Sequence, residues 1–405
     1  MSMLTSLLLI IISARILAGL AERYGQPAIL GEMLAGILLG PTAFNIIDGS
    51  QALSGVADLA VFLIVFSAGL EMDLKEVARM LRGKGLLATI IGFAIPFAVG
   101  FLIGNILGFD ILRTFFMGLC ISITAIPVAI GILTNLNLLN TRLANLTLAT
   151  AVVNDVLALL FLGVLIALPE TKTWATVLSS VFFSSLKLCA FILSVYLTNL
   201  GFMIAQKKGL PIHKIPEQLV GLFGRDALFG ITIAFVLTFG VFSEALGFHN
   251  IIGSFFGALL LRRDFFMAPR YMELQKNINS ISTGFLSPVF FAYIGLQFNI
   301  FAIESVFMVV LIIFGSVVSK IFAGWLSGQI MGFTKSESWG LGIMLNGRGV
   351  MEIVIATIAL EKKFIGQGLY TALVLMGLFT SVITPLLFKL IPGGSEKLSR
   401  ASVNP

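Results

Sequence analysis

One acidic residue of this sequence lies within an apolar segment, where a charged side chain is energetically unfavourable. Asp155 follows Asn154 in the middle of the apolar run 142–168. A carboxylate at the centre of a bilayer costs about 2.5–3.5 kcal/mol, so an acid at that depth indicates a functional site. Burial disfavours the charged form of a carboxyl, which can then take up a proton or a monovalent cation, but hardly both at once. Asp155 is therefore the predicted binding group for a proton and for a monovalent metal cation.

Two neutral residues could add oxygen ligands to this carboxylate. The amide oxygen of Asn154 can coordinate a hard cation, but adjacent helical residues point about 100° apart, so direct ion contact and no contact both stay open. Thr124 precedes Pro127 in another apolar run and could offer its hydroxyl and carbonyl oxygens. The alternative for Thr124 is a hydroxyl bonded back to its own helix.

Three further charged residues lie within apolar runs, and we expect them to be charge partners of the site. Lys320 is near the middle of 303–330, where the alternative is that it snorkels to the interface. Arg348 and Glu352 are four residues apart and share one helix face, which predicts a buried ion pair that braces this helix. Glu32 could line an entry path or cap a helix interface, and no role is predicted for Lys187.

The composition excludes an ordinary soluble protein. Of the 405 residues 58% are hydrophobic and only 11% are charged, whereas soluble domains carry about 25% charged residues. With two cysteines and two histidines, the chain is poorly supplied for a disulfide framework or for histidine-based metal or triad chemistry. We therefore expect an all-α, polytopic membrane protein that is not an enzyme and needs no cofactor beyond the ions it moves.

Thirteen apolar segments are long enough to span a bilayer or nearly so. They are 2–21, 27–47, 53–71, 85–107, 112–134, 142–168, 175–205, 218–243, 248–262, 280–300, 303–330, 338–361 and 367–391. Loops after odd-numbered segments hold 18 basic residues and the other loops hold 4. The positive-inside rule then places the N-terminus outside and the C-terminus inside. The excess of basic residues is a topology signal rather than a nucleic-acid signal, and we expect a multi-pass protein of the plasma (inner) membrane.

An internal repeat divides this transmembrane region. Residues 29–39 align with 251–261 at an offset of 222, 69–74 with 295–300 at 226, and 124–128 with 346–350 at 222. Corresponding segments are seven spans apart, so the two halves must have opposite orientations, as in secondary transporters. We expect one transmembrane domain at 1–391, with repeats at about 27–168 and 248–391, a linker helix at 175–205 and a short cytoplasmic tail at 392–405.

Two helices at matching positions of this repeat are predicted to be broken. Pro127 interrupts one of them, and Gly347 and Gly349 loosen the other. Interrupted helices free backbone carbonyls and N–H groups, which is tolerated at membrane depth only beside a cavity or an ion. The broken backbone would include Ala125 and Ile126.

These motifs together resemble the transmembrane domain of the monovalent cation:proton antiporter-2 family, which includes Kef-type and sodium/proton antiporters and plant cation/proton exchangers. The matching stretches are 26–41, 57–71, 122–128, 154–155, 247–253, 288–296, 319–320 and 346–352. The resemblance implies a thirteen-helix homodimer in lipid, with separate dimerisation and core domains. It also implies elevator-like transport around two crossed, broken helices, with Asp155 as the ion- and proton-binding carboxylate and Lys320 as the core lysine.

Two departures from the family pattern refine this expectation. Electrogenic relatives have two adjacent acids where this chain has Asn154 and Asp155, so Lys320 lacks its usual partner and a one-for-one, electroneutral exchange is favoured. Kef-type proteins append a cytosolic nucleotide-binding domain, so here such regulation would be absent or supplied by a separate chain. The alternative function is a cation channel or the pore subunit of a gated efflux system, and the sequence does not distinguish Na⁺ from K⁺.

Overall fold

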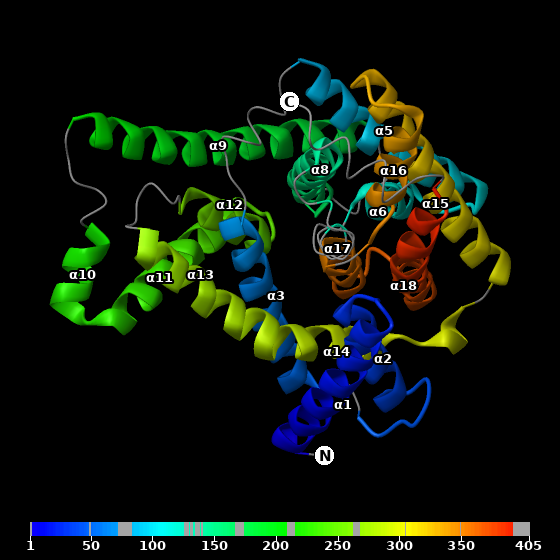
Figure 1. Cartoon of the computed structure of the whole chain (residues 1–405), viewed down its shortest axis with the longest axis horizontal. Helices are drawn as coiled ribbons and strands as arrows, with labels where there is room; N and C mark the ends of the chain where they lie inside the picture. Colours follow the sequence, from blue (N-terminus) through cyan, green and yellow to red (C-terminus); the bar gives the residue numbers. More distant parts are fainter. Residues whose placement is uncertain are drawn as a thin grey trace. The chain divides into compact units, whose positions relative to one another are not determined.

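Helices make up all the regular structure that is described. The computed structural model describes residues 2–47, 50–71, 83–124, 129, 133, 138, 141–166, 174–208, 215–261, 268–303, 305–348 and 350–391, and no strand occurs among them (Figure 1). The helices of the first half are α1 (Met3–Arg23), α2 (Ala28–Leu39), α3 (Gln51–Glu71), α5 (Gly83–Ile106), α6 (Ile111–Ser122), α8 (Arg142–Ile166) and α9 (Trp174–Lys207). Those of the second half are α10 (Ile215–Phe223), α11 (Arg225–Ala245), α12 (Asn250–Leu260), α13 (Ala268–Ile281), α14 (Ser287–Gln297), α15 (Val306–Ile330), α16 (Lys335–Leu345), α17 (Val350–Glu361) and α18 (Gln367–Lys389).

Eight of the described helices are long and apolar enough to cross a membrane: α1, α3, α5, α8, α9, α11, α15 and α18. The prediction of an all-α polytopic membrane protein is thereby confirmed. Each of the thirteen predicted segments contains a helix, but five of them hold none of the eight long helices. Three of these five hold the short apolar helices α2, α6 and α12, and the other two, 280–300 and 338–361, are divided into short helices. The number of thirteen spans and the orientation of the termini stay predictions.

Three predicted segments are divided. The segment 218–243 is split between α10 and α11 at Gly224, whose φ of 88° suits glycine. In the segment 280–300, α13 passes through the π-helix Ser282–Leu286 into α14. The segment 338–361 consists of α16 and α17, which are separated at the predicted break.

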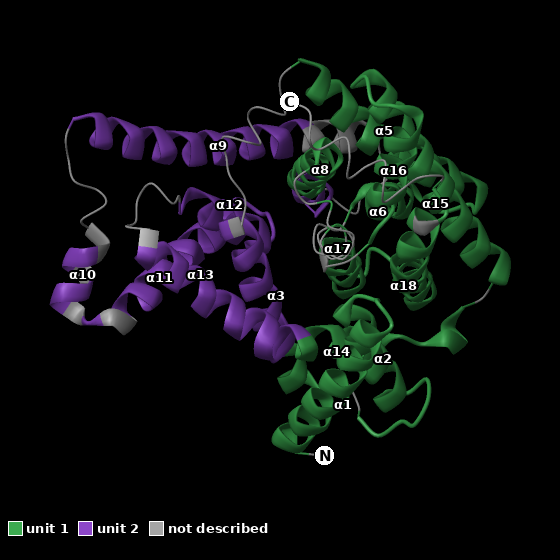
Figure 2. Ribbon diagram, viewed as in Figure 1, with its two compact units in different colours: residues 1–54, 75–158, 288–405 green, residues 55–74, 159–287 purple. Residues whose placement is uncertain are grey.

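The chain forms two compact units, which Figure 2 colours differently. The first unit comprises 1–54, 75–158 and 288–405 and contains α1, α2, α5, α6, α14 to α18 and most of α8. The second comprises 55–74 and 159–287 and contains most of α3 and α9 to α13. All the predicted charge partners and ion ligands belong to the first unit.

Two close glycine–glycine contacts between helices of the first unit are separated by the same number of residues. A Cβ on Gly100 of α5 would lie 2.7 Å from the Gly118 Cα of α6, and a Cβ on Gly324 of α15 would lie 2.5 Å from the Gly342 Cα of α16. Both residues of the second pair are 224 positions beyond those of the first. Small residues let membrane helices approach this closely, so in both helix pairs a glycine of one helix meets a glycine of the other.

Two further close contacts, each between a glycine and a backbone carbonyl, also lie at the offsets of the sequence repeat. One of them is inside the first unit and the other is inside the second. A Cβ on Gly69 would meet the Phe255 carbonyl oxygen at 2.9 Å, and a Cβ on Gly295 would meet the Met33 carbonyl oxygen at 2.2 Å. Phe255 and Met33 differ by 222 positions and the two glycines by 226, which are the offsets of the sequence repeat. The division of the chain into two inverted repeats stays a prediction.

Candidate ion-binding site

The C-terminal end of α6 is the centre of the site. After Ser122 the backbone becomes extended at Ile123, with φ −74° and ψ 153°. The last carbonyls of a helix have no partner within it, and in the interior of a membrane protein water does not replace that partner. Here cationic side chains donate to the carbonyls of four consecutive residues, 120 to 123. The cations also complement the negative end of the helix dipole.

Lys320 supplies one of these cations from α15. Its side chain is completely buried, so it does not snorkel to an interface. The ammonium group donates to the Ser122 carbonyl, to the Thr124 hydroxyl at 2.9 Å and to the Gly92 carbonyl at 3.2 Å. The Gly92 carbonyl lacks an intrahelical donor because Pro96, four residues later in α5, has no N–H. All three donors of the ammonium group are thus used.

Arg348 supplies the second cation from the break between α16 and α17. Its side chain is completely buried. The guanidinium donates to the carbonyls of Cys120, of Ile121 at 2.5 Å and of Ile123 at 3.0 Å, and to the Ser316 hydroxyl at 2.6 Å. Arg348 therefore joins the two broken helices and fastens both to α15.

The predicted pair of Arg348 with Glu352 is present but weak in geometry. Arg348 Nε lies 3.7 Å from Glu352 Oε2, and neither carboxylate oxygen of Glu352 accepts a hydrogen bond. We expected this pair to brace the second broken helix. In the structure the guanidinium hydrogen bonds all leave that helix, and the backbone of the break is held instead by Ser381 of α18, whose hydroxyl donates to the Arg348 carbonyl at 2.7 Å.

Asp155 and Asn154 lie at the middle of α8, and both are buried. Asp155 Oδ1 and both polar atoms of the Asn154 side chain have no hydrogen-bond partner, and neither does the hydroxyl of Thr150, one turn before Asn154. Buried polar atoms are almost always partnered by protein or by ordered water. Unpartnered oxygens on one apolar helix are therefore available to a proton or a cation.

The site also brings opposite charges together without a tight pair. Asp155 lies within electrostatic reach of Lys320, but the described residues include no ion pair of Asp155 within 4.0 Å. Thr150 approaches the same region, because its methyl group lies 3.4 Å from where a Cβ on Gly92 would be. Among the described residues no three His, Cys, Asp or Glu side chains cluster as a metal site would require. A cation at Asp155 would thus have a single carboxylate and neutral oxygens as ligands.

The predicted break residues are placed only in part. Thr124 is buried, and its hydroxyl donates to the Leu345 carbonyl at 3.1 Å, at the end of α16. The Thr124 hydroxyl thus joins the two breaks instead of bonding back to its own helix. The N–H of Gly347 donates to the Met344 carbonyl at 3.3 Å. The predicted positions Ala125, Ile126, Pro127 and Gly349 lie outside the described residues.

Sequence reasoning missed three contributors to the site: the Gly92 carbonyl, Ser316 and the carbonyls of 120–123. A signal existed for the first, since a proline within a helix frees the carbonyl four residues before it. Ser316 lies four residues before Lys320 and thus on the same face of α15. The carbonyls carry no side-chain signature.

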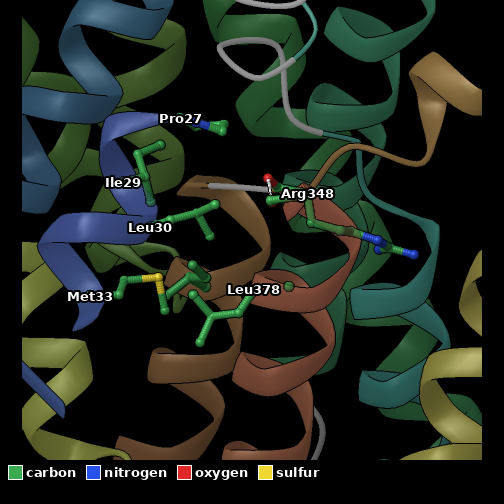
Figure 3. Close-up of a pocket in the computed structure, with 9 residues that line it drawn as sticks. Pro27, Ile29, Leu30, Met33, Arg348 and Leu378 are labelled. Carbon is green, nitrogen blue, oxygen red and sulfur yellow. Dashed lines mark hydrogen bonds between the residues drawn. The ribbon is translucent and has the colours of Figure 1, made fainter. Parts of the chain in front are cut away.

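A small cavity adjoins the second break (Figure 3). In Figure 3, Ile29, Leu30 and Met33 of α2, and Pro27 just before this helix, face Arg348, whose guanidinium points away from them. The cavity is lined by Pro27, Ile29, Leu30, Met33, Arg348, Ile353, Gly377, Leu378 and Ser381. It is mostly apolar and has room for about one water molecule.

Comparison with known proteins shows the family. A model of the transmembrane region of sodium/hydrogen exchangers matches residues 8–391. The chain belongs to this sodium/hydrogen exchanger family. Its relatives include the Na(+)/H(+)-K(+) antiporter GerN of Bacillus cereus, 26% identical over 97% of both chains. Cation/H(+) antiporter 20 of Arabidopsis thaliana is 30% identical over 93% of this chain, which spans 47% of that longer protein.

The fold of this exchanger-family chain is also that of a solved antiporter structure. The structure of the sodium proton antiporter MjNhaP1 from Methanocaldococcus jannaschii at pH 8 superposes with a TM-score of 0.70. It covers 99% of both chains at 17% sequence identity. The predicted family resemblance and fold class are confirmed. The chain is a multi-pass plasma-membrane protein from a family of transporters, not of enzymes.

Proposed function

We propose that this protein exchanges Na⁺ or K⁺ for H⁺ across the membrane, with Asp155 binding either the proton or the cation. The observation that carries the proposal is the buried carboxyl of Asp155, whose Oδ1 has no hydrogen-bond partner. Family membership supports cation/proton antiport as the activity. The name of the relative GerN includes Na⁺, H⁺ and K⁺, so both monovalent cations are candidate substrates.

Asp155 fits the carrier role better than the other buried acid of the site. Glu352 already faces the guanidinium of Arg348, which would compete with a cation for it. Asn154 and Thr124 would supply neutral oxygens beside Asp155. The Thr124 hydroxyl already donates once and accepts once, so one lone pair is left for an ion.

We further propose that exchange is electroneutral and elevator-like. Lys320 is satisfied by two carbonyls and a hydroxyl, so its proton need not be exchanged during the cycle. One carboxylate that alternates between one proton and one cation moves no net charge. Lys320 and Arg348 tie α6, α15 and the α16–α17 break together, as a rigid body that carries the ion would require. A homodimer in the lipid bilayer, with any regulatory subunit on a separate chain, completes the proposal.

The test is proton flux in proteoliposomes that carry a pH gradient, on addition of Na⁺ or K⁺, with and without a clamped membrane potential. Cation-triggered flux that is indifferent to the potential is expected, and the more effective cation is the substrate. Asp155→Asn should abolish exchange because the amide binds neither a proton nor a cation as a carboxylate does. The matched control is Asp110→Asn, an exposed helix N-cap that an asparagine can replace.

Three outcomes would overturn parts of this proposal. Substantial exchange by a folded Asp155→Asn variant would refute the carrier assignment. Flux that follows the membrane potential would refute electroneutrality. Cation permeation without any proton movement would replace the antiporter with a channel.

A further inference from the structure

The first turn of α18 is fastened to the corner of the chain that follows α14. The side-chain amide of Gln367 donates to the Gln297 carbonyl, and the backbone N–H of Asn299 donates to the Thr371 hydroxyl at 3.4 Å. Gln297 is the last residue of α14, and Gln367 and Thr371 lie one turn apart at the start of α18. The predicted topology places both segments on the outer side of the membrane.

The two backbones also touch at this corner. A Cβ on Gly368, between the two bonded residues of α18, would lie 2.6 Å from the carbonyl oxygen of Ala302. Ala302 ends the short 3₁₀-helix η4 (Ile300–Ala302). Any larger residue at position 368 would therefore push η4 away from α18. Gly366, two positions earlier, has open space around it, so the close fit is local.

The corner is held by α2 as well as by α14. The hydroxyl of Thr42, just beyond α2, donates to the Phe298 carbonyl at 2.6 Å. A Cβ on Gly36 of α2 would collide with the backbone carbonyl of Ala292 in α14, and only small residues let membrane helices approach so closely. The corner is therefore part of a tightly packed α2–α14 pair.

Helix α18, in contrast, is tied to the break beside the ion-binding site. The Ser381 hydroxyl donates to the Arg348 carbonyl at 2.7 Å, and the Asn346 amide donates to the Thr384 hydroxyl at 3.2 Å. Thr371 and Ser381 are ten residues apart on this helix, or about 15 Å at 1.5 Å per residue. That is about half of the roughly 30 Å hydrocarbon core. The bonded corner is thus about half a membrane away from the break.

Nearer the break, the contact between α2 and the helices of the site is mostly apolar. Ile29, Leu30 and Met33 of α2 line the cavity of Figure 3 together with Ile353 and Leu378. Hydrophobic contact is non-directional, so such surfaces can slide past each other. Hydrogen bonds tolerate only a narrow range of distances and angles, so those of the corner must break when α18 slides.

We propose that residues 297–302 and 367–371 form an outer latch, which closes the site toward the outer side and opens once in each transport cycle. The inference rests on the proposed exchange by elevator-like movement, in which α18 travels with the site. With the latch closed, Asp155 exchanges its proton or cation with the inner side only. Opening breaks the contacts of the latch and admits the outer solution. The latch therefore stabilises the inward-facing state over the outward-facing one.

Labelling of a buried cysteine measures opening of the latch without any transport. Thr371 is completely buried, so Thr371→Cys should react with a membrane-impermeant maleimide, added outside right-side-out vesicles, only when the latch opens. The background is Cys189→Ser, which removes the exposed cysteine and leaves the buried Cys120. Gln367→Met removes the amide donor and should speed labelling about fivefold, from the usual strength of a side-chain hydrogen bond in a membrane protein. Thr380→Cys, equally buried in α18, is the control, and its labelling should stay slow.

A second variant acts on the backbone contact instead of a hydrogen bond. Gly368→Ala should also speed labelling of Thr371→Cys, because its Cβ pushes η4 away from α18. The matched control is Gly366→Ser, since a serine there meets open space and remains a good N-cap for α18. In proteoliposomes, Gln367→Met and Gly368→Ala should lower the half-saturating outer concentration of the transported cation by up to about fivefold, because a larger fraction of the protein faces outward.

Locking the latch should stop exchange. The pair Asn299→Cys and Thr371→Cys, oxidised to a disulfide in the same background, should lose exchange and recover it on reduction. Each single variant should be indifferent to the oxidant.

Three results would overturn the latch: a pair that forms no disulfide, exchange that continues through a completely formed disulfide, or labelling of Thr371→Cys that neither Gln367→Met nor Gly368→Ala speeds. Absence of cation-triggered proton flux in the unmodified protein would instead overturn the proposed exchange. The labelling rates would still test the latch in that case, because they need no transport.

Discussion

Replacing Lys320 with methionine tests whether this lysine holds the helix break together or handles the ion. Methionine keeps most of the side-chain volume but removes an ammonium that donates three hydrogen bonds, to two carbonyls and the Thr124 hydroxyl. Side-chain hydrogen bonds in membrane proteins contribute about 0.6–1.7 kcal/mol each. Three of them give a loss of about 2–5 kcal/mol in the free energy of unfolding.

The assay is the thermal unfolding midpoint of the detergent-solubilised protein, measured beside exchange in proteoliposomes. Lys320→Met should lower the midpoint by several degrees, while the exchange that remains keeps its apparent affinity for the cation. Lys187→Met is the control, because Lys187 is an exposed lysine in the apolar helix α9. A variant at Lys320 with an unchanged midpoint and no exchange would refute the structural role and make Lys320 part of the ion chemistry.

Three further changes test other parts of the structure. Arg348→Gln should cost about 3–5 kcal/mol of stability, because it removes the guanidinium from three buried carbonyls and leaves Glu352 without its cation. Adding Glu352→Gln should restore the part that comes from Glu352, and a double variant no more stable than the single one would contradict this. Gly324→Ala should destabilise the protein by about 1–3 kcal/mol through overpacking, whereas Gly201→Ala, with open space around it, should not destabilise it. Asn154→Asp adds a second acid and should make cation-driven proton flux respond to the clamped membrane potential; flux that stays indifferent would contradict the single-carboxylate explanation of electroneutrality.

Apolar length and interrupted helices were well predicted from the sequence. All thirteen segments contain helices because a run of apolar residues in a bilayer must satisfy its own backbone hydrogen bonds. The second break was placed correctly, because α16 ends at Leu345 and α17 begins at Val350. Of the first break the structure describes only the end of α6 at Ser122 and the residues 123 and 124. Glycine and proline carry that information locally, so no tertiary contact was needed to find the breaks.

The hydrogen-bond partners of the buried Lys320 and Arg348 side chains were not predicted from the sequence. Spacing along one helix pairs Arg348 with Glu352, and this pair exists at 3.7 Å. The stronger partners of Arg348 are backbone carbonyls about 225 residues away. Carbonyls are present at every residue, so only the crossing of two helices in three dimensions selects which of them a cation meets. The proline in α5 was the one local signal for the partner of Lys320, and its meaning depended on the same packing.

The repeated glycine contacts have a consequence for the energetics of transport. At the offset of 224 between these glycines the counterpart of Lys320 is Pro96, and at the offset of 222 between the predicted breaks the counterpart of Arg348 is Ile126, so neither cation has a charged counterpart in the first predicted repeat. Both cations come from the second repeat, and the four carbonyls they cap come from the first. Under alternating access, two inverted repeats with equal chemistry would give inward-open and outward-open states of equal energy. In this chain only the second repeat supplies the cations, so the inward-open and outward-open states should differ in energy. The state of lower energy should be the resting state, and the two directions of exchange should differ in rate at matched gradients.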